Sequence, residues 1–116
     1  MKKVLYLSTC NTCQRILSEV NTAGFTLQDT KKDPASLEDI EFLRRHVNSY
    51  EDLINKRAKL WQQRGLKDKD LSEDDFKALL VEHYTFIKRP IFIDGSTVFI
   101  GNAKKIIQNL KIHLGV

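Results

Sequence analysis

Long apolar runs and cysteines are both scarce in this chain of 116 residues. No apolar run approaches the ~20 residues that a membrane-spanning helix needs. The apolar stretch that follows Lys2 and Lys3 is too short for a signal peptide. The two cysteines are too few, and too close together, for a secreted domain built on disulfides. We therefore expect a cytoplasmic protein without membrane contact.

A strong charge of one sign is also lacking. The formal net charge is +4, and basic residues are mixed with acidic ones along the chain. This mild excess favours an anionic substrate or partner, but it is too weak to predict binding to nucleic acid. We expect no direct contact with nucleic acid.

Metal ligands are few as well. A zinc site would need two ligands besides the cysteines. The three histidines lie far from the cysteine pair in sequence, on helical patterns, and are typical surface or boundary residues; they are His46, His83 and His113. We expect neither a metal nor an organic cofactor.

The hydrophobic pattern predicts the order β-α-β, then a helical block, then β-β-α. The predicted strands cover residues 3–7, 25–28, 91–93 and 97–100. An amphipathic helix is predicted over residues 12–22, with Gly24 ending it. Ser36 and Ser72 each cap a further helix, and Asp94-Gly95 is a two-residue hairpin signal.

Within the helical block, the first helix should bury Leu37, Ile40, Leu43 and Val47. A short helix is predicted over 50–55. Residues 56–64 are expected to be helical or irregular with Trp61 as an anchor, and the helix after Ser72 should run to about Tyr84. The last helix follows Gly101-Asn102 and should turn Ile106, Ile107 and Leu110 inward.

This order predicts an α/β fold of the thioredoxin-like type. The first two strands, joined through a helix, should be parallel, and the last two should form an antiparallel hairpin. The result is a mixed four-stranded sheet flanked by helices. We expect a single domain over residues 1–116, with a helical subdomain inserted at about 36–86, and a monomer.

The cysteine pair lies at the junction between the first strand and the first helix. Cys10 falls at the helix N-terminus, where free backbone N–H groups and the helix dipole favour negative charge. Its pKa should therefore be lowered, and the thiolate is the reactive form. Cys13 lies one turn further on, so Cys10 can attack a substrate and Cys13 can resolve the mixed disulfide. The alternative, that both are small buried apolar residues, fits Cys13 better than Cys10.

The second candidate feature is Arg89-Pro90, directly before a strand. In thioredoxin-like folds a cis proline lies at this point, opposite the cysteine loop. Arg89 would then place a cation near Cys10, stabilise the thiolate and hold an anionic substrate. The alternatives are a solvated surface charge for Arg89 and an ordinary strand start for Pro90.

At these residues the chain resembles the arsenate reductase-like family, which includes the ArsC enzymes and the Spx regulators. The resemblance covers nearly the whole chain. It rests on four blocks of sequence, which are Tyr6-Leu7-Ser8-Thr9-Cys10-Asn11-Thr12-Cys13, Leu53-Ile54-Asn55-Lys56-Arg57 followed by Trp61, Ile87-Lys88-Arg89-Pro90-Ile91, and Gly101-Asn102.

The resemblance implies that Cys10 is a nucleophile. In ArsC enzymes this cysteine attacks arsenate, and glutathione and glutaredoxin then reduce the adduct. Arginines around the cysteine bind the oxyanion, and Arg57 and Arg89 match two such positions, although the Arg57 block aligns better with Spx-like members. The resemblance thus implies glutathione as co-substrate and glutaredoxin or thioredoxin as partner. We count Thr9, Asn11, Thr12 and Pro90 among the substrate-binding candidates with these arginines.

Two departures separate the chain from the ArsC enzymes. Those enzymes carry a further arginine just after the last strand, where this chain has the Spx-like Gly101-Asn102. One cation fewer should weaken arsenate binding roughly ten- to a hundredfold. The second departure is Cys13, because Spx proteins use a C-x-x-C pair as a redox switch.

Three functions follow from these observations. The first is a thiol oxidoreductase of the arsenate reductase kind, with Cys10, Cys13 and Arg89 as catalytic residues. The second is an Spx-like regulator that binds RNA polymerase and responds to oxidation of the cysteine pair. The third is a redox-inactive member of the family, for which the pKa of Cys10 would stay near the usual ~8.5.

Overall fold

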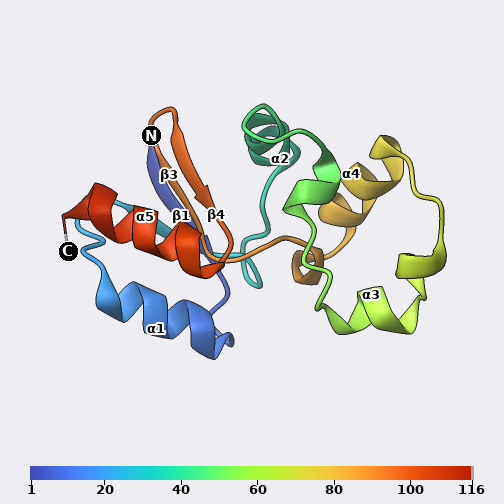
Figure 1. Cartoon of the computed structure of the whole chain (residues 1–116), viewed down its shortest axis with the longest axis horizontal. Helices are drawn as coiled ribbons and strands as arrows, with labels where there is room; N and C mark the ends of the chain where they lie inside the picture. The colour runs from blue at the N-terminus through green and yellow to red at the C-terminus, as the bar shows by residue number, and fades with distance from the viewer. Residues whose placement is uncertain (116) are drawn as a thin grey trace. The chain divides into compact units, whose positions relative to one another are not determined.

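A computed structural model gives the structure of the chain and describes residues 1–115 (Figure 1). The strands are β1 (Lys2–Tyr6), β2 (Thr26–Asp29), β3 (Ile91–Asp94) and β4 (Thr97–Ile100). The α-helices are α1 (Asn11–Glu19), α2 (Leu37–Arg44), α3 (Lys59–Gln63), α4 (Glu73–Glu82) and α5 (Lys104–Leu114). Three short 3₁₀ helices complete the set, η1 (Tyr50–Leu53), η2 (Leu66–Asp68) and η3 (Tyr84–Phe86).

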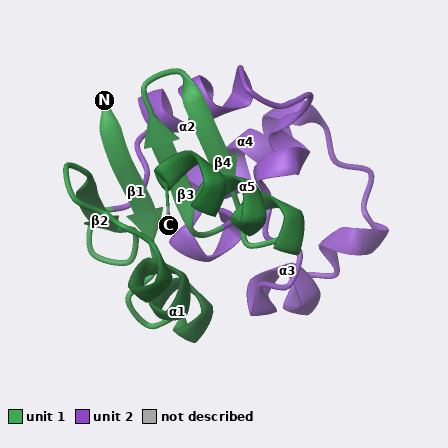
Figure 2. Ribbon diagram, turned by 60° about the vertical axis from the view of Figure 1, so that its left-hand side comes forward, with its two compact units in different colours: residues 1–33, 89–116 green, residues 34–88 purple. Residues whose placement is uncertain are grey.

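The chain divides into two compact units (Figure 2). The sheet unit consists of residues 1–33 and the chain from Arg89 onward, and the helical unit consists of Pro34–Lys88. All four strands with α1 and α5 belong to the sheet unit, and the helical unit holds α2, α3, α4 and the 3₁₀ helices. Among the described residues no helix is long and apolar enough to cross a membrane.

The four strands form one mixed sheet in the order β2-β1-β3-β4. Strand β1 pairs in parallel with β2 and antiparallel with β3, and β3 pairs antiparallel with β4. These pairings confirm the predicted α/β, thioredoxin-like fold with its parallel first pair and its antiparallel hairpin. The parallel pairing brings Tyr6 level with Asp29, at the edge of the sheet where β1 ends.

The core of the sheet unit forms between one face of the sheet and two helices. Val4 of β1 lies opposite Phe92 of β3, and both are buried against Ile16 of α1 and Leu110 of α5. The Phe92 ring meets that of Phe25 edge to face, with centroids 5.8 Å apart. Burial of each large apolar side chain contributes about 1.5–3 kcal/mol. This packing fixes α1 against the end of β1, where the cysteine pair lies.

Element boundaries in the sheet unit differ from the prediction by one to three residues. Strand β1 is Lys2–Tyr6 rather than 3–7, and β2 is Thr26–Asp29 rather than 25–28. Helix α1 ends at Glu19, because Val20 is extended and buries its side chain in the core. Gly24 therefore does not end the helix but lies in the following turn, with φ +84°. In the hairpin, Asp94 still pairs with Thr97, so the two-residue loop is Gly95-Ser96 rather than Asp94-Gly95.

The helical unit begins its helices where the sequence predicts. Ser36 caps α2 by accepting a hydrogen bond from the Asp39 amide, and Ser72 and Asp75 form a reciprocal capping box at α4. The predicted buried stripe of α2 is partly wrong, because Leu37 is 48% exposed and the helix ends before Val47. Helix α4 ends at Glu82 rather than at about Tyr84, because His83 is extended.

Candidate active site

Cys10 occupies the N-cap of α1 and is half-buried. Its backbone N–H donates to the Leu7 carbonyl at 3.0 Å, and its own carbonyl accepts from Gln14 N–H at 3.1 Å. The first bond closes a turn after β1, and the second begins the helix. The sequence prediction that this thiol lies at a helix N-terminus is thus confirmed, and the amides of the first turn favour a negative sulfur.

The loop before Cys10 is fastened at Ser8. The Ser8 N–H donates to Asp29 Oδ1 at 3.2 Å, and the Gln14 side chain donates to the Ser8 carbonyl. Thr30 is buried and donates to the Tyr6 carbonyl from both its amide and its hydroxyl, at 2.8 and 3.0 Å. These contacts tie the loop to the ends of the two parallel strands and to α1.

The Cys10 sulfur is surrounded by groups that favour its anion. Burial raises the pKa of the Cys10 thiol, but four interactions outweigh it and lower the pKa below the usual value. These are the Cys13 amide, a hydrogen bond from the Cys13 thiol, and both a hydrogen bond and the positive charge of Arg89. The side chain does not form the regular cap hydrogen bond of a serine or aspartate.

Cys13 has the opposite environment, although it lies one turn away. Its side chain is fully buried. Burial, together with the negative charge on Cys10, raises the pKa of the Cys13 thiol to about 12. The two sulfurs lie within hydrogen-bond distance, with Cys13 donating to Cys10. The pKa values of the two neighbouring thiols are thus shifted in opposite directions, downward for Cys10 and upward for Cys13.

Arg89 and Pro90 form the second side of the site. The peptide bond between them is cis, as the sequence analysis expected. Two residues that follow β4 hold this turn. The Gly101 N–H donates to the Pro90 carbonyl at 2.9 Å, and Asn102 Nδ2 donates to the Arg89 carbonyl at 3.2 Å. Gly101 has φ +88°, a conformation that favours glycine.

The structure brings Cys10, Cys13 and Arg89 together and places Pro90 in the same turn as Arg89. The other loop candidates lie on either side of Cys10, where Thr9 and Asn11 are exposed and Thr12 is half-buried. Arg57 belongs to the helical unit, is exposed, and donates its backbone N–H to Asn55 Oδ1 at 3.2 Å. It is not among the groups that shift the pKa of Cys10, so its contact with a substrate stays a prediction.

Asp29 and Gln14 are residues that the sequence analysis missed. Hydrogen bonds from Ser8 lower the pKa of the Asp29 carboxyl and keep it ionised. A signal for Asp29 was available, because the carboxyl ends of parallel strands meet at the same edge of a sheet. The end of the second strand should therefore lie beside the cysteine loop. Gln14 is an exposed position on a helix, and nothing in the sequence distinguishes it from other exposed residues.

Chemically, this arrangement suits nucleophilic attack by sulfur followed by thiol–disulfide exchange. Within residues 1–115, no group of three or more His, Cys, Asp or Glu side chains lies where it could hold a metal ion.

Comparison with known proteins agrees with the fold. The global transcriptional regulator Spx 1 of Bacillus cereus is 27% identical over 101 residues, which cover 84% of this chain and 77% of the regulator. The arsenate reductase from Vibrio cholerae has the same fold, with a TM-score of 0.74 at 21% identity over 96% of this chain and 98% of that enzyme. An ArsC family related protein from Bacteroides fragilis gives a TM-score of 0.79 at 22% identity, over 95% and 97% of the two chains. Residues 5–110 match the ArsC family as a whole, and the chain therefore belongs to that family.

Proposed function

We propose that this protein is a thiol-dependent oxidoreductase in which Cys10 is the nucleophile and Cys13 the resolving cysteine. The observation that carries the proposal is the contrast between the two thiols, one with a lowered pKa and the other with a pKa of about 12, at hydrogen-bond distance. A structural pair of buried cysteines would not need an arginine at one of its sulfurs.

In the first step, the Cys10 thiolate attacks an electrophilic sulfur or oxyanion centre. With a disulfide substrate, a bond forms between Cys10 and one substrate sulfur, and the other leaves as a thiolate. Arg89 stabilises the attacking anion and holds an anionic group of the substrate beside it. Thr9, Asn11 and Thr12 flank Cys10 in the chain, and we propose on this ground that they contact the substrate.

In the second step, Cys13 attacks the Cys10 sulfur. The Cys13 thiol loses its proton to solvent, a Cys10–Cys13 disulfide forms, and the remaining substrate group leaves with the electron pair. The negative charge on Cys10 is one of the causes that raise the pKa of Cys13. Once Cys10 is bonded to substrate this charge is gone, so the resolving thiol ionises more easily after the first step than before it. An external thiol, glutathione with glutaredoxin or thioredoxin, then restores both cysteines.

Arsenate is the first substrate to test. Cys10 would displace hydroxide from arsenic(V), and attack by Cys13 on the Cys10 sulfur would release arsenite, so that two electrons pass from the dithiol to arsenic. Arg89 is the cation at the thiol, and Arg57 is proposed as a second. We expect weaker arsenate binding than in ArsC enzymes, which carry a further arginine after the last strand.

The test measures turnover with arsenate and with a glutathione mixed disulfide, with glutathione and glutaredoxin as reductants. We expect turnover in the wild type, none in Cys10→Ser, and a trapped Cys10 adduct by mass spectrometry in Cys13→Ser. Turnover of the disulfide without arsenite production removes the arsenate part alone. Absence of both reactions, with no Cys10 adduct, contradicts the proposal.

A second function is favoured by the curated relatives, which are named global transcriptional regulators Spx. In this case the same Cys10–Cys13 disulfide would act as a switch, and the partner would be RNA polymerase. A pull-down with the RNA polymerase of the host, with the protein reduced and oxidised, tests it. Binding that changes with the oxidation state supports regulation, and absence of binding in both states rules it out.

A further inference from the structure

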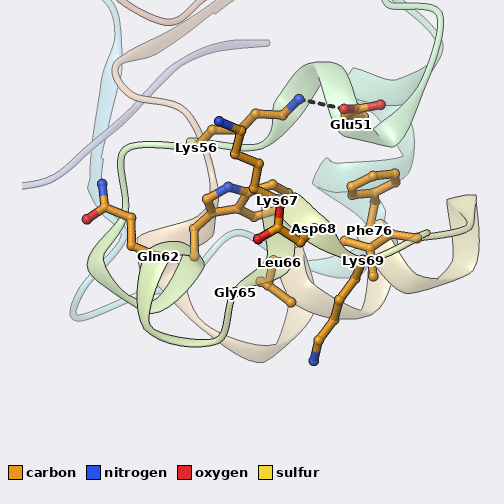
Figure 3. Close-up of a pocket in the computed structure, with 11 residues that line it drawn as sticks. Glu51, Lys56, Gln62, Gly65, Leu66, Lys67, Asp68, Lys69 and Phe76 are labelled. Atoms are coloured by element: carbon orange, nitrogen blue, oxygen red, sulfur yellow. Dashed lines mark hydrogen bonds and ion pairs between the residues drawn. The ribbon is translucent and has the colours of Figure 1, made fainter.

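The helical unit contains a cavity of about 580 Å³ that the cysteine chemistry does not use (Figure 3). Cavities that bind small molecules are usually about 300–1,000 Å³ and combine an apolar wall with a few polar groups. This one lies within the segment around α3 and η2. All of its lining residues belong to the helical unit, so it is separate from the residues of the cysteine site.

The cavity wall is apolar. Trp61, Leu66 and Phe76 contribute to it and are only 6%, 5% and 8% exposed, and Leu71 lies half-buried beside them. The low exposure of these side chains means that they pack against the rest of the helical unit. An apolar body of moderate size would gain burial there without a rearrangement of the wall.

The rim of the cavity is basic. Lys56, Lys67 and Lys69 line it and are exposed. Lys56 forms an ion pair with Glu51 and lies 5.8 Å from the centre of the Trp61 ring. In the described part of the chain, the ammonium groups of Lys67 and Lys69 have no hydrogen-bond or ion-pair partner. Figure 3 shows the Lys67 ammonium on the same side as Lys56, whereas Lys69 extends away from the group.

The surrounding sequence adds to this charge. Residues 56–69 contain six basic residues, Lys56, Arg57, Lys59, Arg64, Lys67 and Lys69, and one acidic residue, Asp68. Such a segment attracts anions before contact is made. The acidic groups on the rim are Asp68 and Glu51, and Glu51 is already neutralised by Lys56.

The geometry points to a binding site for a small amphipathic organic anion, with its apolar or aromatic body against Trp61 and its carboxylate or sulfonate at Lys56 and Lys67. Lys56 can turn from Glu51 toward the ligand because exposed ion pairs are weak. The size of the cavity favours a small molecule over a macromolecular partner, and the partnerless lysine favours an anion over a neutral compound.

Trp61 makes the test direct, because it is the single tryptophan of the chain and lines the cavity. The probe is 8-anilinonaphthalene-1-sulfonate, and the comparison compound is N-phenyl-1-naphthylamine, which lacks the sulfonate. We expect saturable quenching of Trp61 fluorescence with one probe bound per chain, and binding of the neutral compound that is about two- to fivefold weaker. Quenching that does not saturate overturns the proposal.

Variants locate the site. Lys67→Gln should weaken binding of the sulfonate about two- to fivefold and leave binding of the neutral compound unchanged. The matched control is Lys105→Gln on α5, which removes the same charge from an exposed position in the sheet unit. Leu71→Asp places a carboxylate at the wall and should weaken both compounds. Equal sulfonate binding in the Lys67 and Lys105 variants contradicts the proposal.

Measuring Cys10 alkylation in the same variants separates this test from the proposed redox function. The rate of Cys10 alkylation should be the same in Lys67→Gln and the wild type. A loss of probe binding with normal alkylation supports the cavity as a separate site, whatever the outcome of the arsenate assay. If Lys67→Gln loses both probe binding and normal Cys10 alkylation, the variant has damaged the fold. Binding of the neutral compound and the Leu71→Asp variant then decide whether the cavity is the binding site.

Discussion

The key contacts of the two units join residues at very different separations in the sequence. In the sheet unit, the important contact joins Cys10 to Arg89, which lie 79 positions apart in the chain. In the helical unit, the capping bonds join residues three positions apart, as in Ser36 with Asp39 and Ser72 with Asp75. The difference teaches that this chain builds its helices from local bonds and its reactive group from a long-range one. Changes at the contact between Cys10 and Arg89 should therefore affect thiol reactivity, and changes at the helix caps should affect stability.

The largest expected effect concerns the two thiols of the sheet unit. At pH 7.5 iodoacetamide should modify Cys10 at least about a thousandfold faster than Cys13, because the pKa of Cys13 is about 12 and the pKa of Cys10 is lowered. Peptide mass spectrometry of the timed reaction measures both rates. Comparable rates would show that burial does not separate the two sulfurs.

Phe92→Ala tests whether the core of the sheet unit protects Cys13. Loss of this buried ring should cost about 3–5 kcal/mol. Alkylation of Cys13 across a urea gradient reports opening of the sheet unit, and Trp61 fluorescence reports the helical unit. Leu27→Ala is the control, because Leu27 is 47% exposed on β2, and it should shift the urea midpoint little. Protection of Cys13 at the wild-type urea midpoint would contradict the assigned core.

Arg89→Gln tests the long-range contact. Cys10 reactivity rises with pH as the thiolate forms, and the lowered pKa of Cys10 places this rise at a lower pH than for an ordinary cysteine. Without the guanidinium the midpoint should move upward, because Arg89 lowers the pKa of Cys10, and the rate at neutral pH should fall. Arg89→Lys should recover part of the shift. Arg57→Gln, in the helical unit, should leave the midpoint unchanged, and a similar shift there would mean that the helical unit also supplies charge to the thiol.

Ser72→Ala is the corresponding change in the helical unit. Loss of this cap should lower the free energy of unfolding by about 0.5–2 kcal/mol, measured by urea denaturation with Trp61 fluorescence. The alkylation midpoint of Cys10 should not move. A shift of both quantities would show that the Ser72 cap also influences the reactivity of Cys10.

The smallest expected effect is that of Asn102→Ala, which removes the donor to the Arg89 carbonyl. We expect a rise of a few tenths of a pH unit in the alkylation midpoint, because Arg89 then holds its place less well beside Cys10. Asn102→Asp should not restore the midpoint, since its carboxylate offers no donor. An unchanged midpoint in both variants would show that Gly101 alone fixes the turn.

Most of the fold could be predicted from local patterns. The strands, the parallel first pair, the hairpin and the caps at Ser36 and Ser72 follow from periodicity and from residues with one strong conformational preference. The errors fall where packing overrides a local signal. Val20 leaves the helix early to reach the core, which displaces Gly24 from the helix end, and Leu37 faces solvent although it continues an apolar stripe.

The residues of the candidate site also divide into those that local patterns predict and those that depend on packing. Cys10, Cys13, Arg89 and Pro90 could be found from their positions beside predicted strands and helices. Asp29 was missed although strand order could have indicated it, and Gln14 carries no signal at all. The cavity at Trp61 could not be foreseen, since its walls come from three separate helices, α3, η2 and α4, whose arrangement depends on tertiary contacts.

The sequence by itself determined that a thiol stands at the start of a helix and that a second thiol follows one turn later, because strand, loop and helix preferences are local. Only the tertiary structure decided what surrounds each thiol, and these surroundings shift the two pKa values in opposite directions. Burial of Cys13 and the approach of Arg89 to Cys10 depend on strands and helices that meet across the whole chain. The physical reason is that the energy of a charge is set by everything near it in space.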